Sequence, residues 1–237
     1  MSLNSLKAYL ELCRVSNLPT VWTNVLAGVI LSDSRFSWPT VLILALSLSL
    51  FYSGGMCLND ICDADIDRLK RPTRPIPSGR VSRRGAWLCM VLLFTSALTL
   101  LTAVPHPRAL LAGAVLLGII IAYDVLHKAR YLSILLMASC RFMVFVVSAV
   151  AVAGTVGLSA GLAGAVQFAY VLAISAVARH ENSRKEPYSV PLVPLMIAGI
   201  SILDGIIMAV VVAPSWFAAG IGGAVLTLAG QRSIRGD

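Results

Sequence analysis

The sequence predicts an all-α protein, a polytopic membrane bundle of about eight transmembrane helices. The chain has 237 residues, of which 58% are hydrophobic and 13% charged, whereas soluble domains carry about 25% charged residues. Apolar stretches of roughly 15 to 23 residues recur along the whole chain, close to the length that crosses a bilayer as a helix. Because polar stretches between them are short, we expect residues 1–237 to form a single integral membrane domain.

The expected spans follow one another in chain order, and each is an apolar stretch bounded by polar or turn-forming residues. They cover residues 15–32, 39–58, 86–104, 108–123, 132–153, 159–178, 190–212 and 215–231.

Basic residues alternate across the predicted bundle. The N-terminal segment, the loops after the second, fourth and sixth spans, and the C-terminal tail together hold 16 of the 19 Lys and Arg residues. By the positive-inside tendency, these segments and both termini are cytoplasmic, and we expect a multi-pass protein of the plasma membrane. The net charge of +8 therefore fits a membrane surface rather than a nucleic acid partner.

One loop concentrates charge in an unusual way. The segment "NDICDADIDRLKRPTRPIPSGR", residues 59–80, places four aspartates directly after the second span. If that span continues as a helix, four oxygen-bearing side chains lie within an arc of about 100° on one face, and Asp65 points away. Carboxylates aligned in this way repel one another unless a cation binds them, and oxygen donors suit Mg²⁺. The aligned residues are Asn59, Asp60, Asp63 and Asp67.

Basic residues that follow the aspartates could bind the oxygens of a diphosphate, the arginines with their forked donor geometry. Prolines and Gly79 are expected to end the helix and fold this arm back over the site. An alternative interpretation is a solvated loop with topogenic arginines, which we prefer for Arg83 and Arg84. The proposed diphosphate ligands are Arg68, Lys70, Arg71, Arg74 and Arg80.

The motif "NDICDADID" followed by "RPTRPIPSGRVS" closely resembles the first signature of the UbiA superfamily of intramembrane aromatic prenyltransferases. The stretches "RVSNLPTVWTNVLAG" and "YDVLHKARYLSILLMASCR" are also similar to that family. The resemblance implies a helical bundle around a central cavity with cytoplasmic cap loops. It also implies Mg²⁺-dependent transfer of an isoprenyl group from a prenyl diphosphate donor to a hydrophobic, often aromatic, acceptor within the lipid bilayer.

The resemblance carries roles to individual residues. It implies that Asn59, Asp60, Asp63 and Asp67 bind Mg²⁺, and that Asp60, Asp63, Asp67, Lys128 and Arg141 form the catalytic set. The donor and acceptor would be bound by Asn17, Arg68, Arg74, Tyr123, Lys128, Arg141 and Arg179, with Asn17 beside the acceptor.

The loop after the sixth span departs from the family pattern. Where the family has a second aspartate-rich motif, this chain reads "VARHENSRKEPYS". Glu181 is expected to take the place of the missing aspartate as a metal ligand. This version of the loop resembles a divergent, EboC-like branch. The alternative function is therefore a non-catalytic relative that binds or transports a polyprenyl-linked lipid precursor.

A charge inside a span is costly and usually faces the bundle interior. Arg141, about ten residues into the fifth span, is expected to contact the diphosphate or an acidic acceptor; the alternative is a structural pair with Asp124 or Glu181. Asp204, in the seventh span, has no evident partner. The five cysteines are scattered without a C-x-x-C pair and are interpreted as small apolar fillers.

Two other classes of membrane protein fit less well. A transporter predicts paired broken helices near the midplane, whereas the polar residues here gather at one face. A CDP-alcohol phosphotransferase predicts a D-G-x-x-A-R signature, and "LDGII" lacks the Ala-Arg pair.

Overall fold

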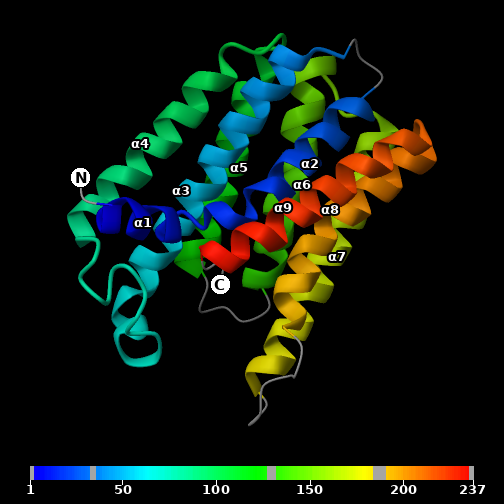
Figure 1. The fold of residues 1–237 in the computed structure, drawn as a ribbon. Helices are drawn as coiled ribbons and strands as arrows, with labels where there is room; N and C mark the ends of the chain where they lie inside the picture. The colour runs from blue at the N-terminus through cyan, green and yellow to red at the C-terminus, as the bar shows by residue number, and fades with distance from the viewer. Residues whose placement is uncertain (1–2, 33–35, 127–131, 184–190, 235–237) are drawn as a thin grey trace.

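The computed structural model describes residues 3–32, 36–126, 132–183 and 191–234, and these residues are almost entirely helical. Eight of the described helices run side by side as a bundle, and α1 crosses one end of it (Figure 1). The helices are α1 (Leu3–Leu12), α2 (Leu18–Ile30), α3 (Trp38–Lys70), α4 (Arg83–Leu101), α5 (Arg108–Leu126), α6 (Leu132–Ala153), α7 (Leu158–Ser183), α8 (Leu192–Val211) and α9 (Phe217–Ser233).

Each predicted span corresponds to one helix from α2 to α9, and the all-α prediction is confirmed. Among the described residues, six helices, α3 to α8, are long and apolar enough to cross a membrane. The first and last predicted spans are shorter, because α2 has 13 residues and α9 has 17. The N-terminal α1 was not predicted as a helix.

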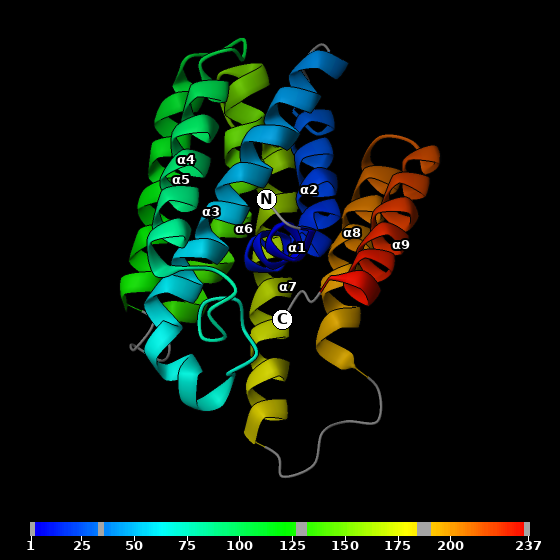
Figure 2. The same ribbon diagram turned by 60° about the vertical axis from the view of Figure 1, so that its left-hand side comes forward.

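The short helix α2 lies in the interior of the bundle, where it packs against α3, α6, α7, α8 and α9 (Figure 2). Nine of its 13 residues are buried. Long leucines on the outer helices are exposed instead, as expected for a surface that faces lipid, where burial gains nothing. The short helix α2 is therefore held mainly by packing against its five neighbouring helices.

Close packing of α8 on α9 depends on two facing glycines. A Cβ atom added to Gly205 would lie 2.8 Å from the Cα of Gly220, closer than real contacts allow. Small residues let helix backbones approach each other in this way inside a membrane.

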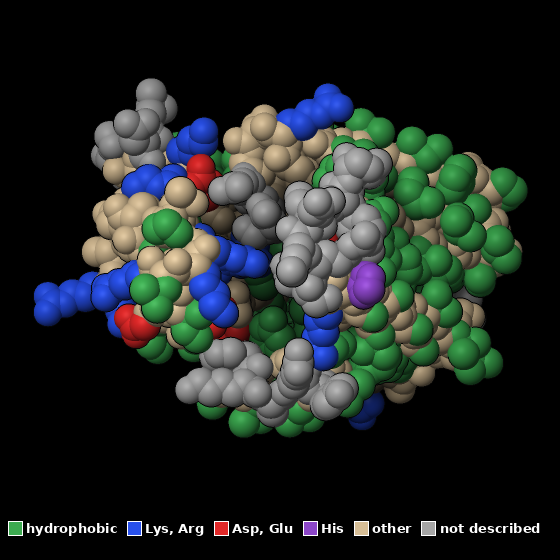
Figure 3. All heavy atoms as spheres, turned by 90° about the horizontal axis from the view of Figure 1, so that it is seen from below, with side chains coloured by type: hydrophobic (Ala, Val, Ile, Leu, Met, Phe, Trp, Pro, Cys, Tyr) green, Lys and Arg blue, Asp and Glu red, His purple; other side chains and the backbone are tan. Residues whose placement is uncertain are grey.

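The ends of several elements meet below the bundle. The helix α3 extends past its apolar part, and the loop after it folds back beside α1 (Figure 2). Seen from this end, Lys, Arg, Asp and Glu side chains gather on the side of α3 and its loop, whereas hydrophobic side chains cover the opposite flank (Figure 3). The charged part of the sequence thus sits at one end of a hydrophobic bundle.

Candidate active site at the mouth of an apolar cavity

The aspartate-rich segment is helical, as predicted, because α3 continues without a break to Lys70. Asp60 and Asp67 are buried, Asn59 and Asp63 are half-buried, and Asp65 is exposed. The four aligned side chains therefore face the protein and Asp65 faces away, which confirms the predicted helical face.

Two arginines neutralise the buried carboxylates. Nη1 of Arg74 lies 2.6 Å from Oδ2 of Asp67 and 3.2 Å from Oδ1 of Asp60. Nη2 of Arg14, from the turn between α1 and α2, lies 3.3 Å from the same Oδ1 of Asp60. Buried carboxylates need such partners, since an uncompensated charge away from water is strongly unfavourable.

The arm between α3 and α4 folds back over the end of α3, as predicted. Its Pro75 and Ile76 are buried, so the arm is anchored by apolar contacts as well as by Arg74. Arg80 donates hydrogen bonds to Oε2 of Glu11 (2.5 Å) and to the carbonyl oxygen of Thr73 (2.7 Å). The arm and the N-terminal segment thereby close around the aspartates.

A basic pocket of about 290 Å³ lies between this arm and the N-terminal segment. Positively charged side chains predominate among its charged lining residues, and Asp60 forms part of its wall. Its charged residues are Glu11, Arg14, Asp60, Lys70, Arg71, Arg74 and Arg80. The pocket has the size and charge to receive a small polyanion.

Arg68 lies apart from this cluster. Its guanidinium is 3.8 Å from Asp65, and both side chains are about two-thirds exposed, at 67% and 66%. Of the two predicted arginines, Arg74 therefore contacts the buried aspartates. Arg68 instead lies near the exposed Asp65.

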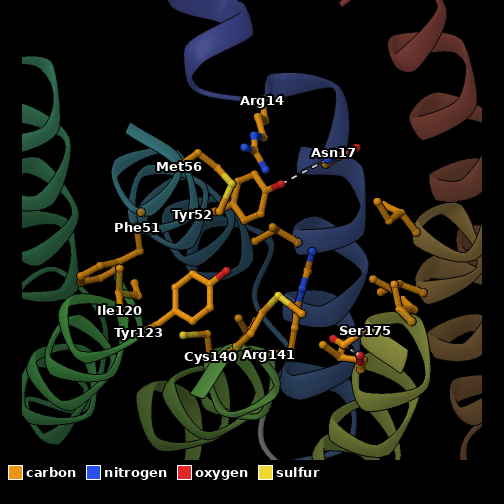
Figure 4. A pocket seen from close by; sticks show the side chains of 18 of the residues that line it. Arg14, Asn17, Phe51, Tyr52, Met56, Ile120, Tyr123, Cys140, Arg141 and Ser175 are labelled. Atoms are coloured by element: carbon orange, nitrogen blue, oxygen red, sulfur yellow. Dashed lines mark hydrogen bonds between the residues drawn. The ribbon is translucent and has the colours of Figure 1, made fainter. Parts of the chain in front are cut away.

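A larger cavity of about 310 Å³ opens inside the bundle next to the charged mouth (Figure 4). Its walls are mostly apolar and come from α2, α3, α5, α6, α7 and α8. Arg14 lines both this cavity and the basic pocket. A ligand with a charged head and an apolar tail could therefore occupy both spaces at once.

Asn17 and Tyr123, two residues predicted to bind substrate, both line the cavity. Asn17 donates from Nδ2 to the hydroxyl of Tyr52 (3.2 Å; Figure 4), and its Oδ1 accepts from Nε2 of Gln231 (3.1 Å). Sequence reasoning gave Tyr52 and Gln231 no role. Neither lies in a polar motif, and each was part of an apolar span.

Asp124 follows Tyr123 at the same wall and was not among the predicted site residues. It is 1% exposed, and its Oδ1 accepts a hydrogen bond from Nδ2 of Asn59 (3.2 Å). The side chain of Asn59 is thus tied to α5, whereas the carboxylates of Asp60 and Asp67 are tied to the arginines. Its position directly after a predicted span was the feature of the sequence that could have marked Asp124 as a site residue.

Arg141 extends from α6 into the cavity, toward the ring of Tyr52 (Figure 4). It donates to Oδ1 of Asn24 and to Oγ1 of Thr20, each at 2.8 Å, and its Cζ lies 5.6 Å from the centre of the Tyr52 ring. Among the described residues, the hydrogen bonds of Arg141 thus go to neutral side chains of α2 rather than to the acids Asp124 or Glu181 that the alternative named.

Asn24 connects Arg141 to a buried acid. It donates from Nδ2 to Oδ2 of Asp204 (2.7 Å), and Gln167 donates from Nε2 to Oδ1 of the same carboxylate (2.7 Å). Asp204 and Gln167 are fully buried. No partner for Asp204 was evident from the sequence. Its two partners, Asn24 in α2 and Gln167 in α7, are far away along the chain.

The predicted residues of the loop after α7 are placed only in part. Arg179 and Glu181 are half-buried near the C-terminal end of α7. That end is separated from the end of α3 in both ribbon views (Figures 1 and 2). Lys128 lies outside the described residues.

The donor set at the end of α3 suits Mg²⁺, because Asn59 and the aspartates offer hard oxygen ligands. Within the described part of the chain, three carboxylates do not converge to within 4.8 Å of one another. Mg²⁺ commonly binds through one or two carboxylates, waters and substrate phosphate oxygens. The arrangement therefore fits an ion held jointly by Asp60, Asp63 or Asp67 and a bound phosphate.

An apolar cavity with carboxylates and guanidiniums at its mouth, inside a bundle of long apolar helices, is the arrangement of an integral multi-pass membrane protein. The chain belongs to the UbiA prenyltransferase family, which it matches over residues 20–234. The recognition made from the aspartate motif is thereby confirmed, while the likeness to an EboC-like branch stays a prediction.

Among curated proteins, the chain is similar to the digeranylgeranylglyceryl phosphate synthase of Sulfolobus acidocaldarius. It is 30% identical over 131 residues, which are 55% of this chain and 46% of that protein. It is also 46% identical over 83 residues to the synthase of Methanococcus vannielii, which are 34% of this chain and 30% of that protein. The alignments thus span half or less of the length of these relatives.

Solved structures share the fold. A structure of digeranylgeranylglyceryl phosphate synthase superposes with a TM-score of 0.66 at 20% identity, covering 97% of this chain and 88% of that chain. A UbiA homologue from Archaeoglobus fulgidus bound to GPP and Mg²⁺ superposes with a TM-score of 0.61 at 17% identity, covering 92% and 86%.

Proposed function

We propose that this chain is a Mg²⁺-dependent intramembrane prenyltransferase, an enzyme that transfers an alkyl or aryl group other than methyl. It moves an isoprenyl chain from a prenyl diphosphate to a hydrophobic acceptor. The observation that carries the proposal is the junction of two spaces at Arg14, with a basic pocket on one side and an apolar cavity on the other.

The donor is bound with its diphosphate at the mouth and its isoprenyl chain in the cavity. Arg14 and Arg74 hold phosphate oxygens, and Tyr123 orients the diphosphate from the cavity wall. Asn59, Asp60, Asp63 and Asp67 would hold Mg²⁺ together with the diphosphate, and the ion would supply positive charge to the leaving group. The resemblance to the family further assigns Lys128 and Glu181 to donor binding, with Arg179 as an additional substrate ligand.

The apolar walls exclude water from the reacting carbon. An allylic cation is quenched quickly by water, so a dry cavity directs it to the acceptor. Asn17, Tyr52 and Arg141, three polar residues that line the cavity, are already hydrogen-bonded to other side chains. The acceptor is therefore the group that captures the cation.

Arg141 selects the acceptor. Its two hydrogen bonds go to neutral side chains, Asn24 and Thr20. The nearest acid in this network is Asp204, which is connected to Arg141 only through Asn24. An aromatic or hydrophobic acceptor that carries an acidic group would complete this arrangement. The curated relatives include synthases of a glyceryl phosphate lipid, which supports an anionic acceptor of that kind.

A second function has one observation in its favour. Asp60 and Asp67 share the guanidinium of Arg74, so Arg74 must be drawn away before either carboxylate can bind a cation freely. A non-catalytic protein that binds or transports a polyprenyl-linked lipid would tolerate this closed mouth. We further propose that the mouth and both termini face the cytoplasm, in the plasma membrane.

The test uses purified protein in nanodiscs and a panel of labelled prenyl diphosphates from geranyl to long-chain, with and without Mg²⁺. Diphosphate release and donor binding are measured on the same samples. The expected result is Mg²⁺-dependent release that Asp63→Ala strongly lowers and that Asp65→Ala, on the other face of α3, preserves. Tight binding without release, with aromatic and glyceryl phosphate acceptors present, would establish the lipid-binding function instead. Absence of donor binding would refute both.

A further inference from the structure

Three cysteines that are far apart in the sequence meet at the end of the bundle. Cys13 follows α1, Cys57 lies in α3 and Cys89 lies in α4. All three sulfur atoms lie within 4.8 Å of one another, and the Sγ atoms of Cys13 and Cys57 are 3.7 Å apart. No sequence motif links these cysteines, and their interpretation as scattered apolar fillers does not anticipate this convergence.

We propose that Cys13, Cys57 and Cys89 hold one thiophilic divalent metal ion of the zinc class. Zinc–sulfur bonds are about 2.3 Å long, so sulfurs at the corners of a tetrahedron around one ion lie about 3.8 Å from each other. The three sulfurs here all lie within 4.8 Å of one another and one pair is at 3.7 Å, so shifts of about an ångström or less bring all three to bonding distance.

Thiolate ligands select soft or borderline metals, whereas the nearby aspartates select hard ones. The two sites therefore take different ions even though they are neighbours. Each thiol loses its proton when the ion binds, so three thiolates and one divalent ion leave a single net negative charge. A monovalent ion would leave two, which is less favourable in a mostly buried position. Cys57 is buried, and Cys13 and Cys89 are half-buried, so a water molecule can reach the fourth position.

The cysteine site is connected to the donor site through two short stretches of chain. Cys13 directly precedes Arg14, and Cys57 lies one helical turn before Asp60. Arg14 and Asp60 form an ion pair at 3.3 Å. Arg14 has a φ of 47°, in the left-handed region that non-glycine residues seldom occupy. An ion bound to Cys13 and Cys57 would restrict the motion of the turn at Arg14. It would thereby hold the Arg14 side chain against Asp60.

Two other outcomes are distinguishable from metal binding. A sulfur–sulfur distance of 3.7 Å is also an ordinary packing contact between small apolar side chains. An oxidant could alternatively join Cys13 to Cys57 in a disulfide, with the loss of two hydrogen atoms. Neither outcome gives a thiolate–metal bond.

The experiment titrates Cd²⁺ alone into the reduced, full-length protein in detergent and follows the thiolate-to-metal charge-transfer absorption in the ultraviolet. Carboxylates do not give this band, so the aspartate site does not contribute to it. Zn²⁺ and Cu⁺ are then tested as competitors. We expect one Cd²⁺ per chain, displaced by Zn²⁺.

The variants decide which thiols are involved. Cys57→Ser should abolish the band, and Cys13→Ser and Cys89→Ser should each weaken binding by more than about 100-fold, which exceeds the effect of changing a residue outside the metal's own ligands. Cys62→Ser and Cys140→Ser, whose thiols are outside the cluster, should bind as the native protein does. If Cys57→Ser fails to fold, the variants of the half-buried Cys13 and Cys89 still test the site.

An unchanged band in both Cys13→Ser and Cys89→Ser would overturn the proposal. So would displacement of Cd²⁺ by Cu⁺ but not by Zn²⁺, or a Cys13–Cys57 disulfide that forms in the presence of excess Zn²⁺. These readouts do not depend on prenyl transfer, so the metal site and the proposed function can fail separately.

Discussion

Arg74 joins two carboxylates that are two turns apart on α3, with Nη1 at 2.6 Å from Asp67 and 3.2 Å from Asp60. The guanidinium comes from the arm that follows the helix, so one side chain closes the arm and neutralises the acids. A diphosphate that binds here competes with carboxylates for Arg74, and Mg²⁺ competes with Arg74 for the carboxylates. Donor and metal are therefore expected to bind together.

Removal of Arg74 should destabilise the fold. Arg74→Ala leaves the buried carboxylate of Asp67 without this partner, and breaking such a pair costs about 3 kcal/mol. Arg68→Ala, which removes a two-thirds-exposed pair, should cost less than about 1 kcal/mol. Unfolding by SDS in mixed micelles measures both free energies. Equal losses in the two variants would contradict the assignment of Arg74 to a buried ion pair.

The two faces of the α3 extension should differ in activity. Asp63→Ala should lower Mg²⁺-dependent diphosphate release by roughly 100-fold, about 2.7 kcal/mol in the barrier, because it removes a ligand for the leaving group. Asp65→Ala, at the exposed position on the opposite face, should stay within about twofold of the native rate. Chelation of Mg²⁺ should reduce the native enzyme to the level of Asp63→Ala. A rate that is independent of Mg²⁺ would refute the metal role.

Arg141 should affect the acceptor and not the donor. Arg141→Gln keeps hydrogen-bonding capacity but removes the charge, and a hydrogen bond to a charged group contributes about 1.5–3 kcal/mol. The KM for an acidic acceptor should therefore rise roughly 10- to 100-fold. The Kd of the prenyl diphosphate, measured without acceptor, should not change. An increase in that Kd would place Arg141 in the donor site instead.

Asp204 should be structural, acting through Asn24 and Gln167. Both of its oxygens accept hydrogen bonds, at 2.7 Å each. Asp204→Asn turns one acceptor into a donor that faces another donor, and an unsatisfied buried polar group costs about 1–3 kcal/mol. Thermal unfolding in detergent should show this loss. Asp204→Asn should also raise the acceptor KM, because Asn24 would no longer be held against Arg141.

Gly205 should not tolerate a side chain. Gly205→Val places atoms against the backbone of Gly220, and overpacking of this kind costs about 1–3 kcal/mol. Gly222 offers a matched control in the same helix pair, because a Cβ there meets no atom within 4 Å. Comparison of the unfolding midpoints of Gly205→Val and Gly222→Val isolates the α8–α9 contact. Similar midpoints would show that the close approach is not required.

Much of the fold and part of the site follow from the sequence alone. Apolar stretches of span length predict the helices α2 to α9, since a backbone in lipid must satisfy its own hydrogen bonds. The spacing of Asn59, Asp60, Asp63 and Asp67 predicts their shared face, because a helix repeats every 3.6 residues. These inferences depend on neighbours within a few residues of each other, where local geometry is nearly invariant. The same local motif identifies the family.

Contacts between helices were decided by the tertiary structure. The sequence predicted that the arm folds back but not that Arg74 contacts Asp67. It did not predict Asn24 and Thr20 as partners of Arg141, and it offered no partner for Asp204. The cysteines at 13, 57 and 89 converge although nothing in their spacing indicates it. The physical reason is that helix packing depends on the shapes of whole surfaces, such as the facing glycines of α8 and α9. Local periodicity states which face a residue occupies, and only packing determines which residue lies opposite.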